Sequence, residues 1–500
     1  MRRAGPLVWT GIEGPTLPDH VRTLLRDGDV GGLSLFARNF RDARQTRDLL
    51  REIHEARPVP IALDQEGGNV VRIAFGTVFP SAMALGATRD EALVERVSGV
   101  VARELRALGI AIDFAPVCDV NVEPANPVIG TRAFSDDPSL CGALAAAWIR
   151  GMQSAGVACT AKHFPGHGAT DLDSHLTLPT VGDDAETLER RDLVPFRAAI
   201  AAGVAQVMTA HVVFAALDTL PATYSRRINV DLLRRRLGFD GVLCSDALEM
   251  KGAALAGAEP AARAIAAGVD IAHVCLPEPR QPERALDAVE RAASAGEIAA
   301  ERMADALRRS RAFAARWTCV PAERPAEPDH AFAIEVAARA VTRVGPALPD
   351  LRSGPLTVAA FPAARASRAE ELNDPLGTLE RALARRFGSR LRFVGLPSEV
   401  DVTNDGALLV VTSSAFFDRE QTTRARELLS RGVRPVLAAI RSPYDAALFP
   451  DVPALLTYSD VPASCEALAM VLSGERAPDG RLPVRLPEST GDAPRISVRA

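Results

Sequence analysis

Eight short apolar runs alternate with longer amphipathic stretches in the N-terminal part of the chain. The runs cover residues 7–11, 31–36, 60–64, 111–117, 157–162, 205–211, 241–246 and 269–275. Several stretches between them, such as 90–109 and 190–203, have apolar residues at helical spacing. Alternating strands and helices predict a parallel sheet, and eight such units in about 250 residues predict a closed (β/α)8 barrel.

Polar residues stand at the ends of five of these runs. They are Asp64, Asp119, Lys162 with His163, His211 and Asp246. One polar residue at a strand end is ordinary for a loop. In a (β/α)8 barrel, however, the carboxyl ends of the strands form the catalytic face. Five such ends together therefore favour an active site at this end of the barrel.

The pattern changes after residue 317. Residues 318–354 include the proline-rich, charged stretch TCVPAERPAEPDH, which predicts a linker. Further apolar runs between residues 356 and 459 are separated by helical stretches. We therefore expect the barrel over residues 1–317 and a smaller, doubly wound α/β sandwich domain over residues 355–500. The chain has no phosphate-binding G-x-x-x-x-G-K-[ST] motif, so nucleotide binding has no support.

The segment AKHFPGHGATDLDSH (161–175) contains three of the eight histidines. Asp173 and His175 are two residues apart, so both face the same side of an extended segment. The carboxylate could then orient the imidazole as a general acid and base. A solvated Asp-Ser-His loop would show the same spacing.

A metal site is the rival hypothesis for this segment. Its three histidines and two aspartates are suitable ligands. The H-x-x-x-H spacing works best on a helix, and Pro165, Gly166 and Gly168 exclude a regular helix between the first two histidines. We therefore expect no metal and no cofactor.

Asp246 and His211 each allow two interpretations. Asp246 ends an apolar run at the predicted barrel mouth, where its carboxylate could attack an electrophilic carbon. It could equally be the N-cap of a following helix. His211 ends an apolar run and could belong to the same catalytic face. It could equally be a core histidine with one hydrogen bond.

Two further motifs contain arginine. In DQEGGNVVR (64–72), Asp64 could bind vicinal hydroxyls and Arg72 could bind a carboxylate or amide oxygen. Its Gln-Glu-Gly-Gly stretch could also be a tight surface turn. Arg132 in PVIGTRAF lies in an apolar context, where a merely solvated charge is less expected.

Net charge, apolar segments and cysteine content limit the classes of partner and the compartment that the sequence supports. A formal charge of −5 and a pI near 6.0 give no electrostatic reason to expect nucleic acid or anionic membrane as a partner. The start lacks the apolar core of a signal peptide, and no apolar run is long enough to span a membrane. Seven scattered cysteines without C-x-x-C predict reduced thiols in a cytoplasmic protein. Lys162 and Lys251 are the only lysines.

Four ordered motifs together resemble glycoside hydrolase family 3. They are DQEGG, IGTRAF, KHFPGHG followed by D-S-H, and the strand end SDALEM. The D-S-H version resembles the β-N-acetylglucosaminidase branch, the NagZ-type enzymes. The likeness covers roughly residues 5–315, and GERAPDGRLPVRLP (474–487) resembles the tail of the family's C-terminal α/β sandwich domain.

The resemblance implies a role for each matching residue. Asp246 matches the nucleophile, His175 the general acid/base and Asp173 its partner. The positions that match binding of the non-reducing N-acetylglucosamine are Asp64, Arg72, Arg132, Lys162 and His163. Two departures leave finer substrate contacts open: Asn69 follows DQEGG where arginine is common, and Ala247 follows Asp246 where aspartate is common.

The implied activity is retaining hydrolysis of terminal β-linked N-acetylglucosamine, in recycling of cell-wall fragments in the cytoplasm. The expected partner is therefore a carbohydrate such as a GlcNAc-containing muropeptide. Within the family, a β-N-acetylglucosaminide phosphorylase or a β-glucosidase is the alternative. A sugar-binding protein without catalysis is a further alternative from a different class.

Overall fold

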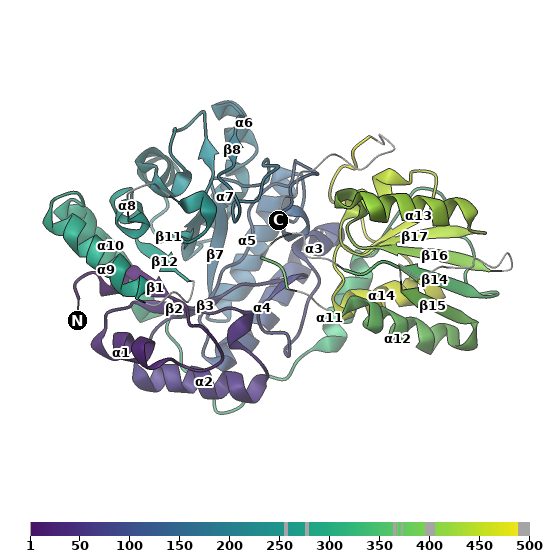
Figure 1. Cartoon of the computed structure of the whole chain (residues 1–500), viewed down its shortest axis with the longest axis horizontal. Helices are drawn as coiled ribbons and strands as arrows, with labels where there is room; N and C mark the ends of the chain where they lie inside the picture. Colours follow the sequence, from purple (N-terminus) through teal and green to yellow (C-terminus); the bar gives the residue numbers. More distant parts are fainter. Residues whose placement is uncertain are drawn as a thin grey trace.

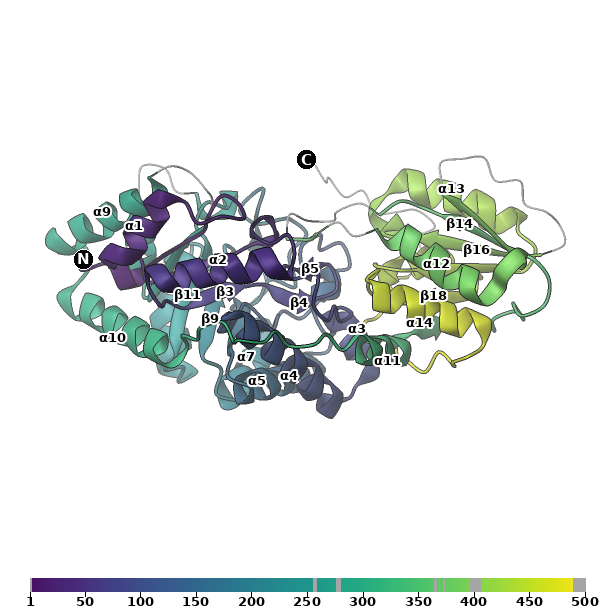
Figure 2. The same ribbon diagram turned by 90° about the horizontal axis from the view of Figure 1, so that it is seen from below.

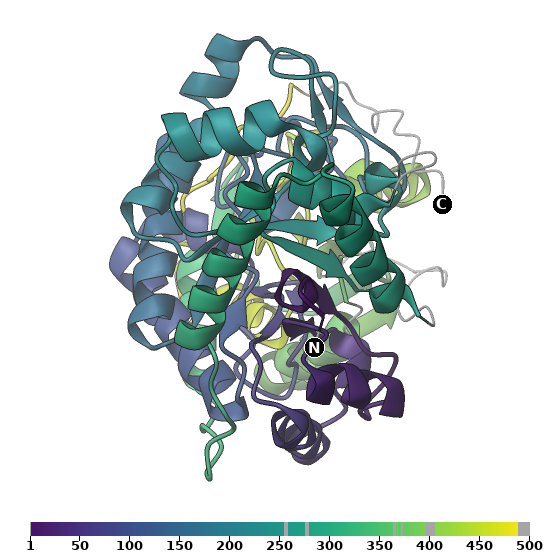
Figure 3. The same ribbon diagram turned by 90° about the vertical axis from the view of Figure 1, so that its left-hand side faces the viewer.

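The chain forms a closed barrel and a second, open sheet that lie side by side along the long axis of the molecule (Figure 1). The computed structural model describes residues 2–254, 259–275, 280–363, 367, 369–371, 374–395 and 406–488. Viewed from the barrel end, the barrel helices lie in front of the second sheet (Figure 3).

The barrel has eight parallel strands in sequence order, and the last pairs with the first. They are β1 (Val8–Thr10), β2 (Gly32–Ser34), β3 (Ile61–Leu63), β6 (Ile112–Asp113), β7 (Ala158–Phe164), β9 (Gln206–Thr209), β11 (Val242–Ala247) and β12 (Ile271–Val274). Each strand begins within one of the eight predicted runs. The predicted (β/α)8 barrel is confirmed.

Helices surround the strands because their apolar faces pack on the barrel. They are α1 (Asp19–Asp27), α2 (Ala43–Ala56), α4 (Glu91–Leu108), α5 (Pro138–Ser154), α6 (Ala185–Arg190), α7 (Leu193–Ala201), α8 (Pro260–Ala266), α9 (Gln281–Ser294) and α10 (Ala300–Arg316). A π-helical segment (Arg227–Arg236) stands between β9 and β11. Several helices start at an aspartate cap, such as Asp90, whose side chain accepts from the Leu93 N–H. No described helix has the length and apolar character needed to cross a membrane.

A two-stranded hairpin follows β3 and carries the DQEGG motif. Its strands are β4 (Gln65–Gly67) and β5 (Val70–Val71). Gly67 and Gly68 both have positive φ, and a Cβ on Gly68 would lie 2.7 Å from the Cβ of Ser81. The glycines therefore let the turn pack closely, which directs the hairpin side chains into the barrel mouth.

The second sheet has the order β13-β18-β17-β16-β14-β15, and only the β13–β18 pair is antiparallel. Its strands are β13 (Thr342–Val344), β14 (Leu356–Ala360), β15 (Leu391–Gly395), β16 (Ala407–Thr412), β17 (Pro435–Ala439) and β18 (Ala454–Leu456). Helix α13 (Arg419–Arg431) covers one face, and α12 (Pro375–Phe387) and α14 (Pro462–Ser473) cover the other (Figure 1). This matches the predicted α/β sandwich.

The predicted linker 318–354 contains regular structure. Helix α11 (His330–Ala340) packs against α14 and against α3 (Ala82–Thr88), and β13 is part of the second sheet. Figure 2 shows an extended segment running under the barrel from α10 to α11. Alanines among the buried residues of α11, such as Ala333 and Ala337, give it a weak apolar pattern next to a proline-rich stretch. The linker expectation is therefore corrected: the irregular part ends before α11.

Several contacts hold the second sheet on the barrel. The side chain of Asn121 donates to the Tyr444 hydroxyl at 2.6 Å. The Ser81 hydroxyl donates to the Tyr458 carbonyl at 2.8 Å. Part of the predicted tail (474–487) returns to the barrel, where the Ser135 hydroxyl donates to the Pro483 carbonyl at 2.5 Å. Residues 489–500 lie outside the described part of the chain.

Candidate active site

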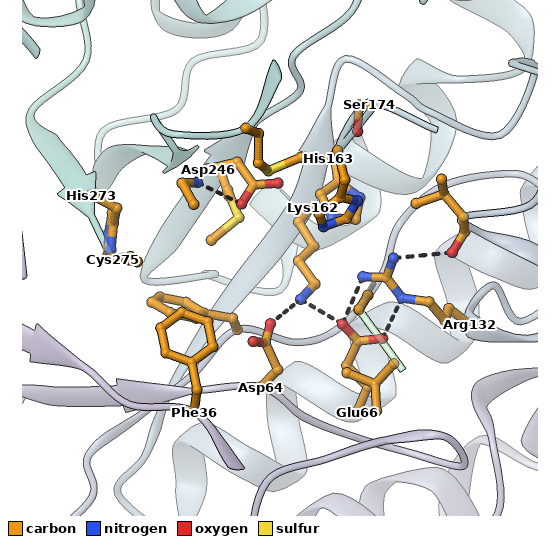
Figure 4. A pocket seen from close by; sticks show the side chains of 18 of the residues that line it. Phe36, Asp64, Glu66, Arg132, Lys162, His163, Ser174, Asp246, His273 and Cys275 are labelled. Atoms are coloured by element: carbon orange, nitrogen blue, oxygen red, sulfur yellow. Dashed lines mark hydrogen bonds and ion pairs between the residues drawn. The ribbon is translucent and has the colours of Figure 1, made fainter. Parts of the chain in front are cut away.

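A cavity of about 480 Å³ opens at the carboxyl ends of the barrel strands (Figure 4). Its lining includes seven of the eight residues predicted for the site: Asp64, Arg72, Arg132, Lys162, His163, His175 and Asp246. The eighth, Asp173, is hydrogen-bonded to His175. Chain folding thus brings together residues that lie up to 182 positions apart between Asp64 and Asp246.

Asp246 lies near the end of β11, and its carboxylate points into the cavity (Figure 4). One carboxylate oxygen accepts from the Ala247 N–H at 2.7 Å. Removal from bulk water raises the pKa of Asp246, but the electrostatic effect of His211, His163 and His175 outweighs it and holds the pKa below its usual value. The carboxylate is therefore ionised near neutral pH, as a nucleophile requires.

His175 and Asp173 form a pair at the cavity rim. Nδ1 of His175 lies 2.7 Å from Oδ1 of Asp173. Burial raises the pKa of Asp173, but the hydrogen bond and charge of His175 hold it below its usual value. The ionised carboxylate therefore keeps the proton on Nδ1 and leaves Nε2 for proton exchange. The predicted Asp173–His175 contact is present, but the segment is a turn rather than extended, because the Leu176 and Thr177 N–H groups both donate to the Asp173 carbonyl.

The other two histidines of this segment have separate partners. His163 Nδ1 lies 2.7 Å from Asp119, which also accepts from the His167 N–H at 2.7 Å. His167 contacts the Ser174 hydroxyl, and burial lowers its pKa to about 4. Within the described ranges, no three His, Cys, Asp or Glu side chains are grouped so that they could hold a metal ion.

Lys162 is almost fully buried between two carboxylates (Figure 4). Its Nζ lies 2.6 Å from Asp64 and 2.5 Å from Glu66. Arg132 binds Glu66 through two nitrogens, both at 2.8 Å, and Arg72 contacts Asp64 at 3.1 Å. Acidic and basic groups therefore alternate across the cavity floor.

This ion network sets the charges of its members. Burial raises the pKa values of Asp64 and Glu66, but the cations, Lys162 foremost at Asp64 and Arg132 at Glu66, outweigh it and hold both values below normal. Burial lowers the pKa of Lys162, but Asp64 and Glu66 raise it above normal overall. All these groups are therefore charged near neutral pH. Glu66, at 5 % exposure, is not the surface turn residue that its motif allowed.

The cavity floor also holds a residue that sequence reasoning missed. His273 on β12 is fully buried, with Nδ1 at 2.8 Å from the Ser34 hydroxyl and its ring against Trp9 and Phe114. Within the described structure, its Nε2 has no hydrogen-bond partner. Burial lowers its pKa to about 4. The sequence feature that could have indicated His273 was its position as a polar residue inside the apolar run 269–275.

The second sheet domain contributes to the cavity wall. Arg72 donates to the Ala369 carbonyl and to the Glu371 carboxylate, both at 2.9 Å. The Glu371 N–H donates to the Asn69 carbonyl at 2.7 Å. Asn69, a departure noted in the sequence, thus binds the second domain through its backbone. No local motif marked Ala369 or Glu371.

The arrangement joins a nucleophilic carboxylate, a proton-exchanging imidazole and a floor of hydrogen-bonding charges. Such a cavity suits acid/base-assisted displacement on a small, hydroxyl-rich molecule.

His211, which allowed two interpretations, makes two hydrogen bonds, to the Thr223 hydroxyl and to the Ala247 carbonyl. It therefore supports the backbone next to Asp246.

Comparison with known proteins identifies the family. The family described as "Glycosyl hydrolase family 3 N terminal domain" matches residues 8–311. A beta-hexosaminidase of Pseudomonas aeruginosa strain LESB58 is 42% identical over 286 residues, which are 56% of this chain and 85% of that protein.

Two solved structures extend the likeness. A family 3 beta-N-acetylglucosaminidase from Paenibacillus sp. str. FPU-7 is 33% identical with a TM-score of 0.89, covering 98% of this chain and 99% of that one. NagZ from Neisseria gonorrhoeae, in complex with N-trifluoroacetyl-D-glucosamine, is 36% identical with a TM-score of 0.55, covering 66% and 93%. With its barrel matched by the family along nearly its whole length, the chain belongs to glycosyl hydrolase family 3.

Proposed function

We propose that this protein is a retaining β-N-acetylhexosaminidase that removes terminal β-linked N-acetylglucosamine through a covalent glycosyl-aspartate. The observation that carries the proposal is the placement of Asp246 and His175 along one cavity, with Asp173 bound to His175. The names of the beta-hexosaminidase and beta-N-acetylglucosaminidase relatives support the choice of sugar.

In the first step, the Asp246 carboxylate attacks the anomeric carbon while the bond to the leaving oxygen breaks. Protonated His175 donates its Nε2 proton to that oxygen, and the leaving group departs as an alcohol. Asp173 stabilises the imidazolium before the transfer. The product is a glycosyl ester on Asp246.

In the second step, neutral His175 accepts a proton from water as the water oxygen attacks the anomeric carbon. The ester bond breaks, Asp246 returns as a carboxylate and His175 is again protonated. Two displacements at one carbon retain the β configuration. Most such enzymes use two carboxylates, whereas here an imidazole–carboxylate pair takes the acid/base role.

The ion network would hold the sugar. Asp64 would accept hydrogen bonds from hydroxyls, while Arg72, Arg132, Lys162 and His163 would donate to hydroxyls or the acetamide. Lys162 has three N–H donors, of which Asp64 and Glu66 occupy two, so one remains for substrate. Glu66 would orient Lys162 and Arg132 rather than touch the reacting atoms.

We further propose that the natural substrates are GlcNAc-containing muropeptides or related cell-wall fragments, hydrolysed in the cytoplasm. The resemblance to the D-S-H branch supports this assignment.

Phosphorolysis is the second candidate function. A neutral imidazole at position 175 would not repel phosphate as a carboxylate would. Free sugar and sugar phosphate are distinguishable products, so their yields with and without added phosphate separate the two reactions.

An activity screen tests the proposal. We expect turnover of 4-nitrophenyl β-N-acetylglucosaminide far above that of the matching β-glucoside and β-xyloside, with free β-configured sugar as the first product. Preference for the glucoside would contradict the assigned sugar. Absence of turnover on all three would favour a sugar-binding protein.

A further inference from the structure

The chain contains 58 basic residues, of which only Lys162 and Lys251 are lysines, and both line the candidate active-site cavity. Arginine therefore serves at every other basic position. The ammonium of lysine is a compact charge on a flexible side chain, whereas the guanidinium of arginine is a rigid, planar fork. A lysine therefore suits a site that needs a single mobile contact. The ion pairs of Lys162 with Asp64 and Glu66 account for that lysine. The proposed mechanism gives Lys251 no role.

Lys251 differs from the other basic side chains of the cavity. Arg72, Arg132 and Lys162 pair with carboxylates. Arg38 donates to the Ile12 and Cys275 carbonyls. Lys251 is exposed, and within the described ranges no hydrogen bond or ion pair involves its ammonium. It therefore presents an uncommitted positive charge at the cavity.

The backbone places Lys251 beside the loop of the proposed acid/base. The next residue, Gly252, donates its N–H to the Ser174 carbonyl at 3.0 Å, and Ser174 directly precedes His175. A Cβ on Gly252 would lie 2.9 Å from the same carbonyl oxygen, so the two segments are in close contact. In Figure 4, Ser174 lies at the top of the cavity and Asp64 and Glu66 at the bottom, with His163 and Lys162 between them.

In the proposed mechanism, this position would lie on the leaving-group side. His175 must reach the leaving oxygen, and Asp64, Glu66 and Lys162 form the cavity floor, where the terminal sugar would bind. A leaving group that extends past His175 would meet the Lys251 segment. A neutral leaving group would offer the ammonium no charged partner.

We infer that Lys251 is a specificity-determining residue that binds a carboxylate on the leaving group. This inference rests on the proposed function and names its substrate class: β-N-acetylglucosaminides whose leaving group is acidic. The contact is a mobile N⁺–H···O⁻ pair in partly solvated surroundings, so it adds moderate selectivity and is screened by salt.

Two matched substrates test the inference: 4-carboxyphenyl and 4-carbamoylphenyl β-N-acetylglucosaminide, of nearly equal shape. The readout is the kcat/KM ratio of the acidic to the neutral substrate, in which a general loss of activity cancels. Relative to wild type, we expect Lys251→Met to lower this ratio about threefold and Lys251→Glu about tenfold, as for a solvated charge pair. Lys251→Arg should keep most of the ratio, and added salt should reduce it in the wild type.

Arg324→Met is the control, because Arg324 is exposed, lies outside the cavity lining and loses the same charge. A ratio that is unchanged in Lys251→Glu, or changed equally in Arg324→Met, would overturn the inference. Lys251→Met could instead leave the ratio constant and lower the yield of sugar phosphate. This result would also overturn the inference and would indicate that the lysine binds free phosphate. Wild-type protein that turns over neither substrate would instead refute the proposed function.

Discussion

Nδ1 of His175 and the backbone N–H of His175 both point at one oxygen of Asp173, at 2.7 and 2.8 Å. Two bonds to the same carboxylate oxygen fix the ring orientation and the tautomer. The Asp173 side chain is itself almost fully buried, so the pair is held as a unit at the cavity rim.

His175→Ala should lower kcat/KM by ~10²–10⁴-fold for substrates with a poor leaving group, because general acid catalysis is lost. The loss should be smaller for an activated aryl leaving group, which departs without a proton. Steady-state kinetics on both substrate types measures the difference. Equal losses would contradict the acid role. As a control, Asp173→Asn should show the same leaving-group dependence with a smaller loss, because the imidazole remains.

Lys162→Met should lower the free energy of unfolding by about 3–5 kcal/mol, because it leaves buried Glu66 and partly buried Asp64 with one cation fewer. The same substitution at exposed Lys251 is the matched control and should change stability by about 0.5 kcal/mol or less. All three tryptophans lie in residues 1–317, so urea unfolding followed by tryptophan fluorescence reports on the barrel. Similar small effects at both lysines would contradict the ion network.

The barrel should lose stability as the pH falls from 7.5 to 5, in part through His273. Burial lowers the pKa of His273 in the folded state to about 4, whereas the unfolded side chain titrates near 6.5. Between these values the unfolded state binds more protons, so stability falls with pH below about 6.5. At pH 5 this single group costs about 2 kcal/mol.

His273→Phe should reduce this drop by about that amount, as measured by urea unfolding at both pH values. Each variant is compared with itself at the two pH values, so any effect of the substitution on the free energy of unfolding that is the same at both pH values cancels. His20, whose side chain is exposed, is the control position, and His20→Phe should show the wild-type drop. An unchanged drop in His273→Phe would contradict a neutral, buried His273.

Arg72 joins Asp64 on the barrel to Ala369 and Glu371 on the second domain. Arg72→Met should therefore speed hydrogen exchange at the Glu371 amide about tenfold, which corresponds to the loss of about 1.5 kcal/mol in a charge-assisted hydrogen bond. Glu371→Gln keeps a hydrogen-bond acceptor and should have a smaller effect. Unchanged exchange in Arg72→Met would contradict a role of Arg72 in holding this segment.

The barrel was predictable because its strands are buried on both faces and appear as near-continuous apolar runs. The strand-end residues could be predicted for the same reason, since parallel strands end at one edge. The i, i+2 spacing then predicted the Asp173–His175 contact. Helix α11 was not predicted, because its alanines give a weak apolar pattern beside the prolines.

Other parts of the site depend on long-range contacts. Glu66 is buried only because Lys162 and Arg132, far along the chain, neutralise it, and no local pattern of DQEGG shows this. Glu371 is 299 positions from Arg72, and only the packing of the second domain brings the two together. Such pairings are properties of the folded chain rather than of any segment.

The most direct test of the account is to identify the residue that carries the sugar. A fluorinated N-acetylglucosaminide that slows the second step should trap a glycosyl-enzyme, and peptide mass spectrometry should locate the sugar on Asp246. Asp246→Ala should form no adduct. A sugar attached to a different carboxylate, such as Asp64 or Glu249, which also line the cavity, would contradict the proposed mechanism. Turnover that persists in Asp246→Ala would contradict it as well.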